Sequence, residues 1–168
     1  MKRNSLSILF FAFTLFVFFQ SCKKDNAEGD AADKDLFSET SKSGYTYYQN
    51  LTTIFPASGN SPHGFVRVRF NSIAQAVLDS TGKLPVGASF PAGSVIVKEI
   101  FTSASGTINQ YSIMKKDPGS PVAGSGWIWG EYKTDGSPTF SAGKNGSGCI
   151  SCHSGSANRD LVRWFDLH

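Results

Sequence analysis

The chain has 168 residues, with 16 Lys and Arg against 13 Asp and Glu, and a formal net charge of +3 at neutral pH. This length is typical of one domain rather than several. The small net charge gives no reason to expect a nucleic-acid partner, because proteins that bind nucleic acids usually carry a strong basic patch.

Residues 1–21 have the pattern of a secretion signal peptide. Lys2 and Arg3 supply its positive start, and an apolar run from Leu6 to Phe19 forms its body. This run is shorter than the roughly 20 residues of a membrane-spanning helix, which argues against a permanent transmembrane anchor. We therefore expect export and removal of the segment. Loss of Lys2 and Arg3 from the 16 basic residues would leave a formal charge of +1 instead of +3.

Cys22 follows the small residue Ser21, which is the arrangement of a lipoprotein processing site. Phe19 and Gln20 differ from the residues most often found before such a cysteine. We expect Cys22 to carry lipid, so that the exported protein is anchored to a membrane, in the periplasm or at the outer membrane.

Residues 22–42 are rich in Asp, Glu, Lys, Ala and Ser, and their only large apolar side chains are Leu36 and Phe37. Such a segment buries too little apolar surface to offset the entropy that it loses on ordering. We predict a lipidated N-terminus and flexible tether over residues 22–42, followed by one folded domain over residues 43–168.

Strand patterns dominate the predicted domain. A short amphipathic helix is predicted between Tyr45 and Phe55, and a second helix begins after Asn71, a good N-cap residue, and ends near 79–82. Strands are predicted at 66–70, 94–101, 108–115 and 127–132, and turns at 91–93 and 134–137. The fold class is therefore mainly β (α+β), an antiparallel sheet with one or two short helices.

Cys149, Cys152 and His153 form the Cys-x-x-Cys-His motif of c-type haem attachment near the end of the chain. Each thiol can form a thioether with a porphyrin vinyl group, and the adjoining histidine can then ligate the iron. We predict one covalent haem c per chain, with the sheet and helices packed around it.

Three other interpretations of this motif explain less. A structural zinc site needs a second pair of soft ligands, whereas Cys22, His63 and His168 are isolated. A thioredoxin-like dithiol normally accompanies a βαβ pattern. A plain disulfide between the two cysteines leaves His153 without a role.

The position of the motif excludes two common haem classes. Small electron-transfer cytochromes c carry the motif early and a methionine ligand well downstream, but no Met follows His153. Cytochromes c′ carry it late but need four long helices, which the 17 glycines and the strand patterns disfavour.

The chain resembles the cytochrome P-460 family and its relative cytochrome c′-beta from about His63 to Asp166. The similar segments are 90–100 (FPAGSVIVKEI), 126–129 (GWIW) and 149–165. The resemblance implies a β-rich, exported haem protein, usually homodimeric, with five-coordinate iron. Members named cytochrome P-460 oxidise hydroxylamine, whereas c′-beta relatives bind nitric oxide or carbon monoxide, or carry electrons.

The resemblance also implies roles for single residues. Cys149 and Cys152 match the haem attachment sites, and His153 matches the proximal iron ligand. Lys98 matches the lysine that is bonded to a porphyrin meso carbon in cytochrome P-460. From the residues alone, Lys98 shares a strand face with apolar neighbours and either reaches solvent along its stem or is neutralised by such a bond.

Candidate catalytic residues on the open side of the haem are less well matched. Arg67 corresponds loosely to a distal arginine, and the alternative is a solvated charge on the outer strand face. His63 lies where a bulky distal side chain is expected, or is a plain loop residue. The segment that carries the family's distal glutamate is shortened between 114 and 126. Glu131 shares the predicted face of Trp129 and is a candidate pocket acid.

Two functions remain open. In the first, the protein oxidises hydroxylamine or a related small nitrogen species at the haem, and electrons leave to a soluble redox partner. In the second, it binds nitric oxide or transfers electrons without catalysis. The polarity of the pocket discriminates between them, since an acid or His63 near the open iron face favours the enzyme.

Overall fold

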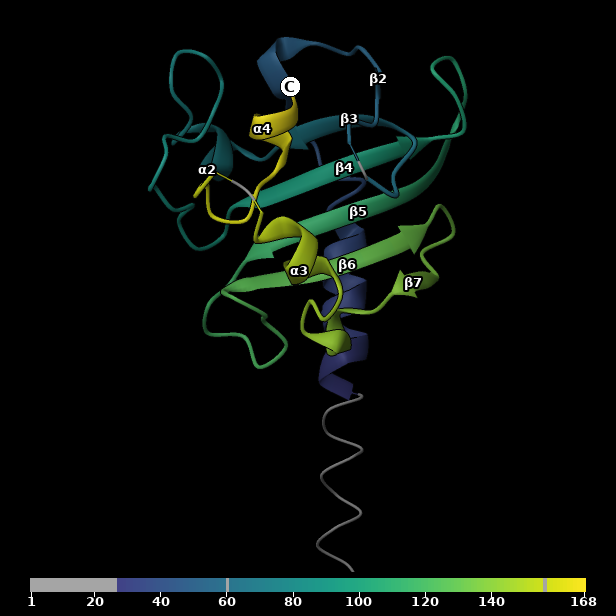
Figure 1. Ribbon diagram of the computed structural model, residues 1–168. Coiled ribbons are helices and arrows are strands. Elements are labelled where there is room, and N and C mark those ends of the chain that lie inside the picture. Colours follow the sequence, from purple (N-terminus) through teal and green to yellow (C-terminus); the bar gives the residue numbers. More distant parts are fainter. Residues whose placement is uncertain (1–26, 60, 156) are drawn as a thin grey trace, which may run out of the picture.

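The computed structural model describes residues 27–59, 61–155 and 157–168 (Figure 1). Its centre is an antiparallel sheet whose longer strands are β3 (Phe65–Phe70), β4 (Val95–Phe101), β5 (Ile108–Lys116) and β6 (Trp127–Lys133). These four strands pair in the order in which they follow one another in the chain. The predicted mainly β, antiparallel fold with short helices is confirmed.

Three short strands complete the sheet at its two edges. β7 (Pro138–Phe140) pairs with β6, and β1 (Thr46–Tyr47) and β2 (Phe55–Pro56) both pair with β3. The turn predicted at 134–137 connects β6 to β7. Each of the four predicted strands lies within one residue of an observed one at both ends, because the period-two alternation marks them clearly.

The amphipathic helix predicted between Tyr45 and Phe55 is wrong. This region forms β1, the single turn η1 (Tyr48–Asn50) and β2. Gln49 and Asn50 adopt positive φ angles of 51° and 59°, which an α-helix cannot contain. Pairing with β3 on both sides of this turn decides the local structure.

The helix predicted after Asn71 is present but shorter than expected. α2 covers Ser72–Gln75, and the Asn71 carboxamide accepts a hydrogen bond from the backbone N–H of Ala74 at 2.9 Å. The same side-chain oxygen accepts from the N–H of Val95 at 3.0 Å, so the N-cap also fixes the start of β4.

The prediction of a flexible tether is wrong for residues 27–38, which form a helix. The side chain of Leu36 is fully buried. The Asp33 carboxylate accepts hydrogen bonds from the Tyr132 hydroxyl at 2.8 Å, from Ser141 Oγ at 2.7 Å and from the N–H of Ala142 at 2.7 Å. A few apolar contacts, made by Leu36, Phe37 and Ala32, and one satisfied carboxylate thus dock a segment whose overall composition is polar. The expected signal peptide and Cys22 lie outside the described residues.

The alternation of side chains gives the sheet two buried faces. Residues 27–38 cover one face, where they meet Val97, Ile113 and Ile128. The C-terminal segment covers the other face with two short helices, α3 (Cys149–His153) and α4 (Trp164–Leu167). Figure 1 shows these helices in yellow in front of the strands and the helix of residues 27–38 in purple behind them. A turn of 3-10 helix, η2 (Ala142–Lys144), connects β7 to α3.

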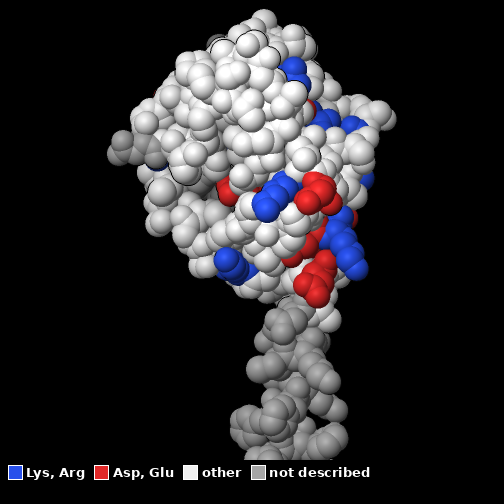
Figure 2. Space-filling model, turned by 90° about the vertical axis from the view of Figure 1, so that its right-hand side faces the viewer, with Lys and Arg blue, Asp and Glu red and all other residues white. Residues whose placement is uncertain are grey.

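Charged side chains gather in the lower half of the face shown in Figure 2, where basic and acidic groups alternate. A surface of mixed sign gives this face no strong field for a polyanion. In the part of the chain that the structure describes, no helix combines the length and the apolar composition needed to cross a membrane.

Replacement of Leu36 by Ala tests the docking of the N-terminal helix. Leu36 is fully buried, so Leu36→Ala should lower the free energy of unfolding by about 2–5 kcal/mol. Leu51 is 43% exposed, and Leu51→Ala should change the free energy of unfolding by less than about 0.5 kcal/mol. Denaturant titration measures both values. Equal values for the two variants would contradict the docked helix.

Candidate functional site

A cavity of about 500 Å³ lies between the C-terminal segment and the neighbouring face of the sheet. Its walls are mainly apolar and include Val66, Val68, Ile96, Met114, Trp129 and Val162. The titratable or charged side chains that reach it include Lys98, Glu131, Arg163 and the three histidines of the chain, and Ser58, Ser61 and Ser112 also line it. Such a combination of apolar walls and a few convergent polar groups is typical of a ligand or cofactor site.

α3 brings the two cysteines to the rim of this cavity. They lie three residues apart on one helical turn, so both side chains fall on the same side, and both thiols are free. Gly146 allows this approach, because a Cβ atom there would lie 2.5 Å from the ring of Trp129 on β6. Burial raises the pKa of the Cys149 thiol to about 11, whereas Cys152 is exposed at the molecular surface.

His153 presents one ring nitrogen to the cavity. Its Nδ1 lies 2.7 Å from the carbonyl oxygen of Leu161, and a carbonyl can only accept, so Nδ1 carries the proton. The ring stands edge-on to Trp129, with centroids 4.9 Å apart. Burial lowers the pKa of His153 to about 4, which leaves the imidazole neutral at pH 7. Its Nε2 therefore keeps a lone pair for a metal ion.

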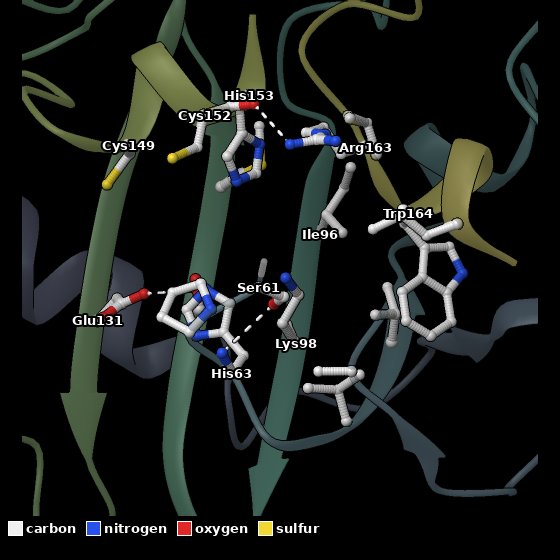
Figure 3. A pocket seen from close by; sticks show the side chains of 18 of the residues that line it. Ser61, His63, Ile96, Lys98, Glu131, Cys149, Cys152, His153, Arg163 and Trp164 are labelled. Atoms are coloured by element: carbon white, nitrogen blue, oxygen red, sulfur yellow. Dashed lines mark hydrogen bonds and ion pairs between the residues drawn. The ribbon is translucent and has the colours of Figure 1, made fainter. Parts of the chain in front are cut away.

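Lys98 enters the cavity from β4. Its neighbours across the sheet are Val68 and Ser112, and its face is the one that also carries Ile96. Burial lowers the pKa of Lys98 to about 8, although the negative charge of Glu131 opposes this shift. A substantial fraction of the amine is then neutral near physiological pH. Figure 3 shows Lys98 on the opposite side of the pocket from the His153 ring.

Glu131 and His63 approach each other on the side of the pocket away from His153 (Figure 3). His63 Nε2 lies 3.5 Å from Glu131 Oε1, and the other carboxylate oxygen accepts from Gln110 Nε2 at 2.9 Å. Burial, together with the nearby charge of Lys98, lowers the pKa of His63 to about 3. Burial raises the pKa of Glu131, an effect that Lys98 and Ser112 oppose. The site thus pairs a neutral imidazole with a carboxylate of increased basicity.

Arg67 does not line the pocket, and the distal role expected for it is wrong. It occupies the opposite face of β3, where its Nε donates to Glu99 Oε2 at 2.7 Å and its guanidinium lies 4.4 Å from the centroid of the Tyr47 ring. Strand alternation explains this position, because Val66 and Val68 already take the pocket face.

His168 lies in the pocket although the sequence carries no signal for this. Its ring contacts that of Trp164 at a centroid distance of 4.0 Å. Lys83 Nζ donates to the carbonyl oxygens of Phe165 and His168 at 2.8 Å each, which fixes the end of the chain. This position depends on packing between distant segments, which no local pattern encodes.

The residues of this site fit a haem. Two free thiols stand three residues apart at the rim, a neutral imidazole with a free Nε2 follows them, and the apolar walls match the character of a porphyrin ring. The cavity volume of about 500 Å³ lies in the range of cofactor sites.

The buried His63 makes the stability of the protein depend on pH. Its pKa of about 3 in the folded state lies below the ordinary value of 6.5, so the unfolded chain takes up the proton first. The stability that depends on neutral His63 is complete above pH 6.5 and is lost as the pH falls toward 3. The free energy of unfolding can be measured at a series of pH values between 3 and 6.5. His63→Phe should lower the slope of this free energy against pH by up to ~1.4 kcal/mol per pH unit. Equal slopes in the wild type and the variant would mean that the His63 side chain is exposed to water and not buried.

Comparison with known families supports the assignment made from the geometry. A search of curated proteins gives no match. The family model described as cytochrome P460 matches residues 42–163, which is more than half of the chain and includes the pocket residues His63, Lys98, Glu131 and His153. The chain therefore belongs to the cytochrome P460 family, whose cofactor is haem.

Proposed function

We propose that this protein oxidises hydroxylamine or a related small nitrogen species at a covalently bound haem c. The observation that carries the proposal is the acid and imidazole pair in the pocket. Glu131 and His63 lie 3.5 Å apart on the side away from His153, so a molecule bound between them and the iron would meet a base.

The residues that would hold the cofactor are those of α3. Cys149 and Cys152 supply the two thioether sulfurs, and His153 Nε2 is the iron ligand, with its ring fixed by the Leu161 carbonyl. A haem held in this position would supply an iron that binds nitrogen and accepts electrons. Because Cys152 is exposed, the attachment end lies near the surface, where a soluble redox partner can receive electrons.

Oxidation of hydroxylamine removes protons together with electrons, so the pocket must accept protons. Glu131 is the stronger acceptor, because its raised pKa makes the carboxylate more basic than one in water. The neutral His63 directs Nε2 toward Glu131, which leaves the carboxylate held from two sides, by His63 and by Gln110. The Glu131 side chain is 23% exposed, so protons that it takes up can pass to solvent.

Lys98 supports the same function in a second way. A neutral amine can form a bond that an ammonium cannot, and burial makes Lys98 partly neutral near pH 8. We propose that Lys98 is the site of the second porphyrin attachment that the resemblance implies. The proposal also includes four expectations from the sequence and the resemblance: export, a lipid at Cys22, a membrane-anchored location and a homodimer.

The alternative function, binding of nitric oxide or transfer of electrons without catalysis, is less well supported. A pocket for such a role needs only apolar walls opposite the proximal histidine. Lys98, His63 and Glu131 all reach this cavity, and two of them have pKa values that burial moves far from the ordinary range. Groups perturbed in this way gather at catalytic sites more often than at passive ones.

The replacement Glu131→Gln tests the proposed base. The variant keeps the shape and the Gln110 contact but cannot take a proton, so the turnover rate with hydroxylamine should fall by about 10²- to 10⁴-fold while the haem spectrum is retained. Steady-state kinetics with an artificial electron acceptor measure the turnover rate, and an absorption spectrum checks that the haem is retained.

Glu39→Gln is the matched control, since Glu39 is a buried acid outside the pocket, bound to the Tyr45 hydroxyl at 2.7 Å. The control should retain the wild-type rate. An unchanged rate in Glu131→Gln would contradict the proposed base. A wild-type protein that binds nitric oxide tightly but does not turn over hydroxylamine would favour the alternative function instead.

A further inference from the structure

The carbonyl group that orients His153 belongs to a backbone segment of unusual conformation. Leu161, whose oxygen accepts from His153 Nδ1 at 2.7 Å, has a φ of 67°, and Asp160 and Asn158 have φ angles of 50° and 53°. Residues with a side chain rarely adopt this left-handed region, and Leu gains nothing from it locally. Contacts elsewhere must therefore hold these residues in place.

Asp160 supplies those contacts. Its carboxylate is 9% exposed, and its two oxygens lie 2.7 and 2.9 Å from Lys116 Nζ on β5. One oxygen also accepts from the N–H of Phe90 at 2.8 Å. The backbone carbonyl of Asp160 accepts from Trp127 Nε1 on β6 at 3.1 Å. Two strands and the loop before β4 thus hold the residue that directly precedes Leu161.

The anchors of Asp160 are themselves rigid. Lys116 is 11% exposed in its side chain, and its ammonium lies 4.9 Å from the centroid of the Trp127 ring. Trp127 is fully buried. Neither residue lines the pocket, and both contact Asp160 directly.

We propose that Asp160 is a positioning residue for the iron ligand. By fixing the left-handed segment to β5 and β6, it holds the Leu161 carbonyl against the Nδ1–H of His153. A hydrogen bond to this nitrogen increases the electron density at Nε2, which strengthens the bond to the iron and favours the ferric state. The inference deepens the proposed function and depends on one part of it, the ligation of iron by His153.

The test compares two buried ion pairs of the holoprotein. Asp160→Asn keeps the size of the side chain but removes the charge that binds Lys116. Glu99→Gln is the matched control, because the Glu99 side chain is 6% exposed and pairs with Arg67 Nη2 at 2.6 Å and Arg69 Nε at 3.2 Å on the opposite face of the sheet. The measurements are the iron–histidine stretching band in the resonance Raman spectrum of the ferrous protein and the reduction potential.

Both variants should lower the midpoint of thermal unfolding. Only Asp160→Asn should also move the iron–histidine band to lower frequency and the reduction potential to a more positive value. Equal bands and potentials in Asp160→Asn and the wild type would overturn the inference, and so would the same shift in Glu99→Gln. If the wild type has no such band, the ligation by His153 fails, which is a failure of the proposed function and not of this inference alone.

A second variant keeps the test decisive if Asp160→Asn does not fold. Trp127→Phe retains an aromatic ring but removes the N–H that donates to the Asp160 carbonyl. It should shift the band and the potential in the same direction by a smaller amount. Wild-type values in Trp127→Phe would count against the proposal in that case.

Discussion

The C-terminal segment is fixed to one face of the sheet by contacts of Asp160 and Phe165, and the pocket lies between this segment and the sheet. Phe165 stacks on Phe70 of β3 with centroids 5.8 Å apart and ring planes 10° apart. Asp160 binds Lys116 of β5 through both carboxylate oxygens. Residues before, between and after these two attachments line the cavity, among them His153, Val162 and His168. Ordinary core packing thus produces the site and also fixes the residues that orient His153.

Desolvation is the second constraint on the site. Four titratable groups that share the apolar cavity have pKa values shifted toward the neutral form, which reduces the charge in the cavity. His63 and His153 become neutral, and Lys98 becomes easier to deprotonate. Glu131 becomes easier to protonate, because burial outweighs the attraction of Lys98. The same low polarity that suits a porphyrin therefore prepares a neutral iron ligand, a neutral amine and a basic carboxylate, which are the forms that the proposed reaction needs.

Local patterns in the sequence predicted the strands of the sheet and the site residues that depend on them. The alternation around Lys98 placed its side chain with Ile96, and the same reasoning identified Glu131 beside Trp129. Arg67 was misplaced because it was matched to a family position, although its own strand alternation directs it to the other face.

Other features depend on contacts between segments far apart in the chain. The helix of residues 27–38 is stabilised by hydrogen bonds from Tyr132 and Ser141 to Asp33, across about a hundred residues. The position of His168 depends on Lys83 in the same way. Amino-acid composition cannot reveal such contacts. A flexible polar tether and a polar helix that is docked by one carboxylate can have the same composition.

Peptide mapping of the protein tests the central claim, that α3 carries a covalent haem, most directly. After alkylation of free thiols and digestion with trypsin under denaturing conditions, residues 145–159 form the peptide that contains Cys149, Cys152 and His153. The account predicts that this peptide carries one haem and no alkyl group, and that the haem joins it to the peptide that contains Lys98. A peptide alkylated at both cysteines, with haem lost on denaturation, would contradict it.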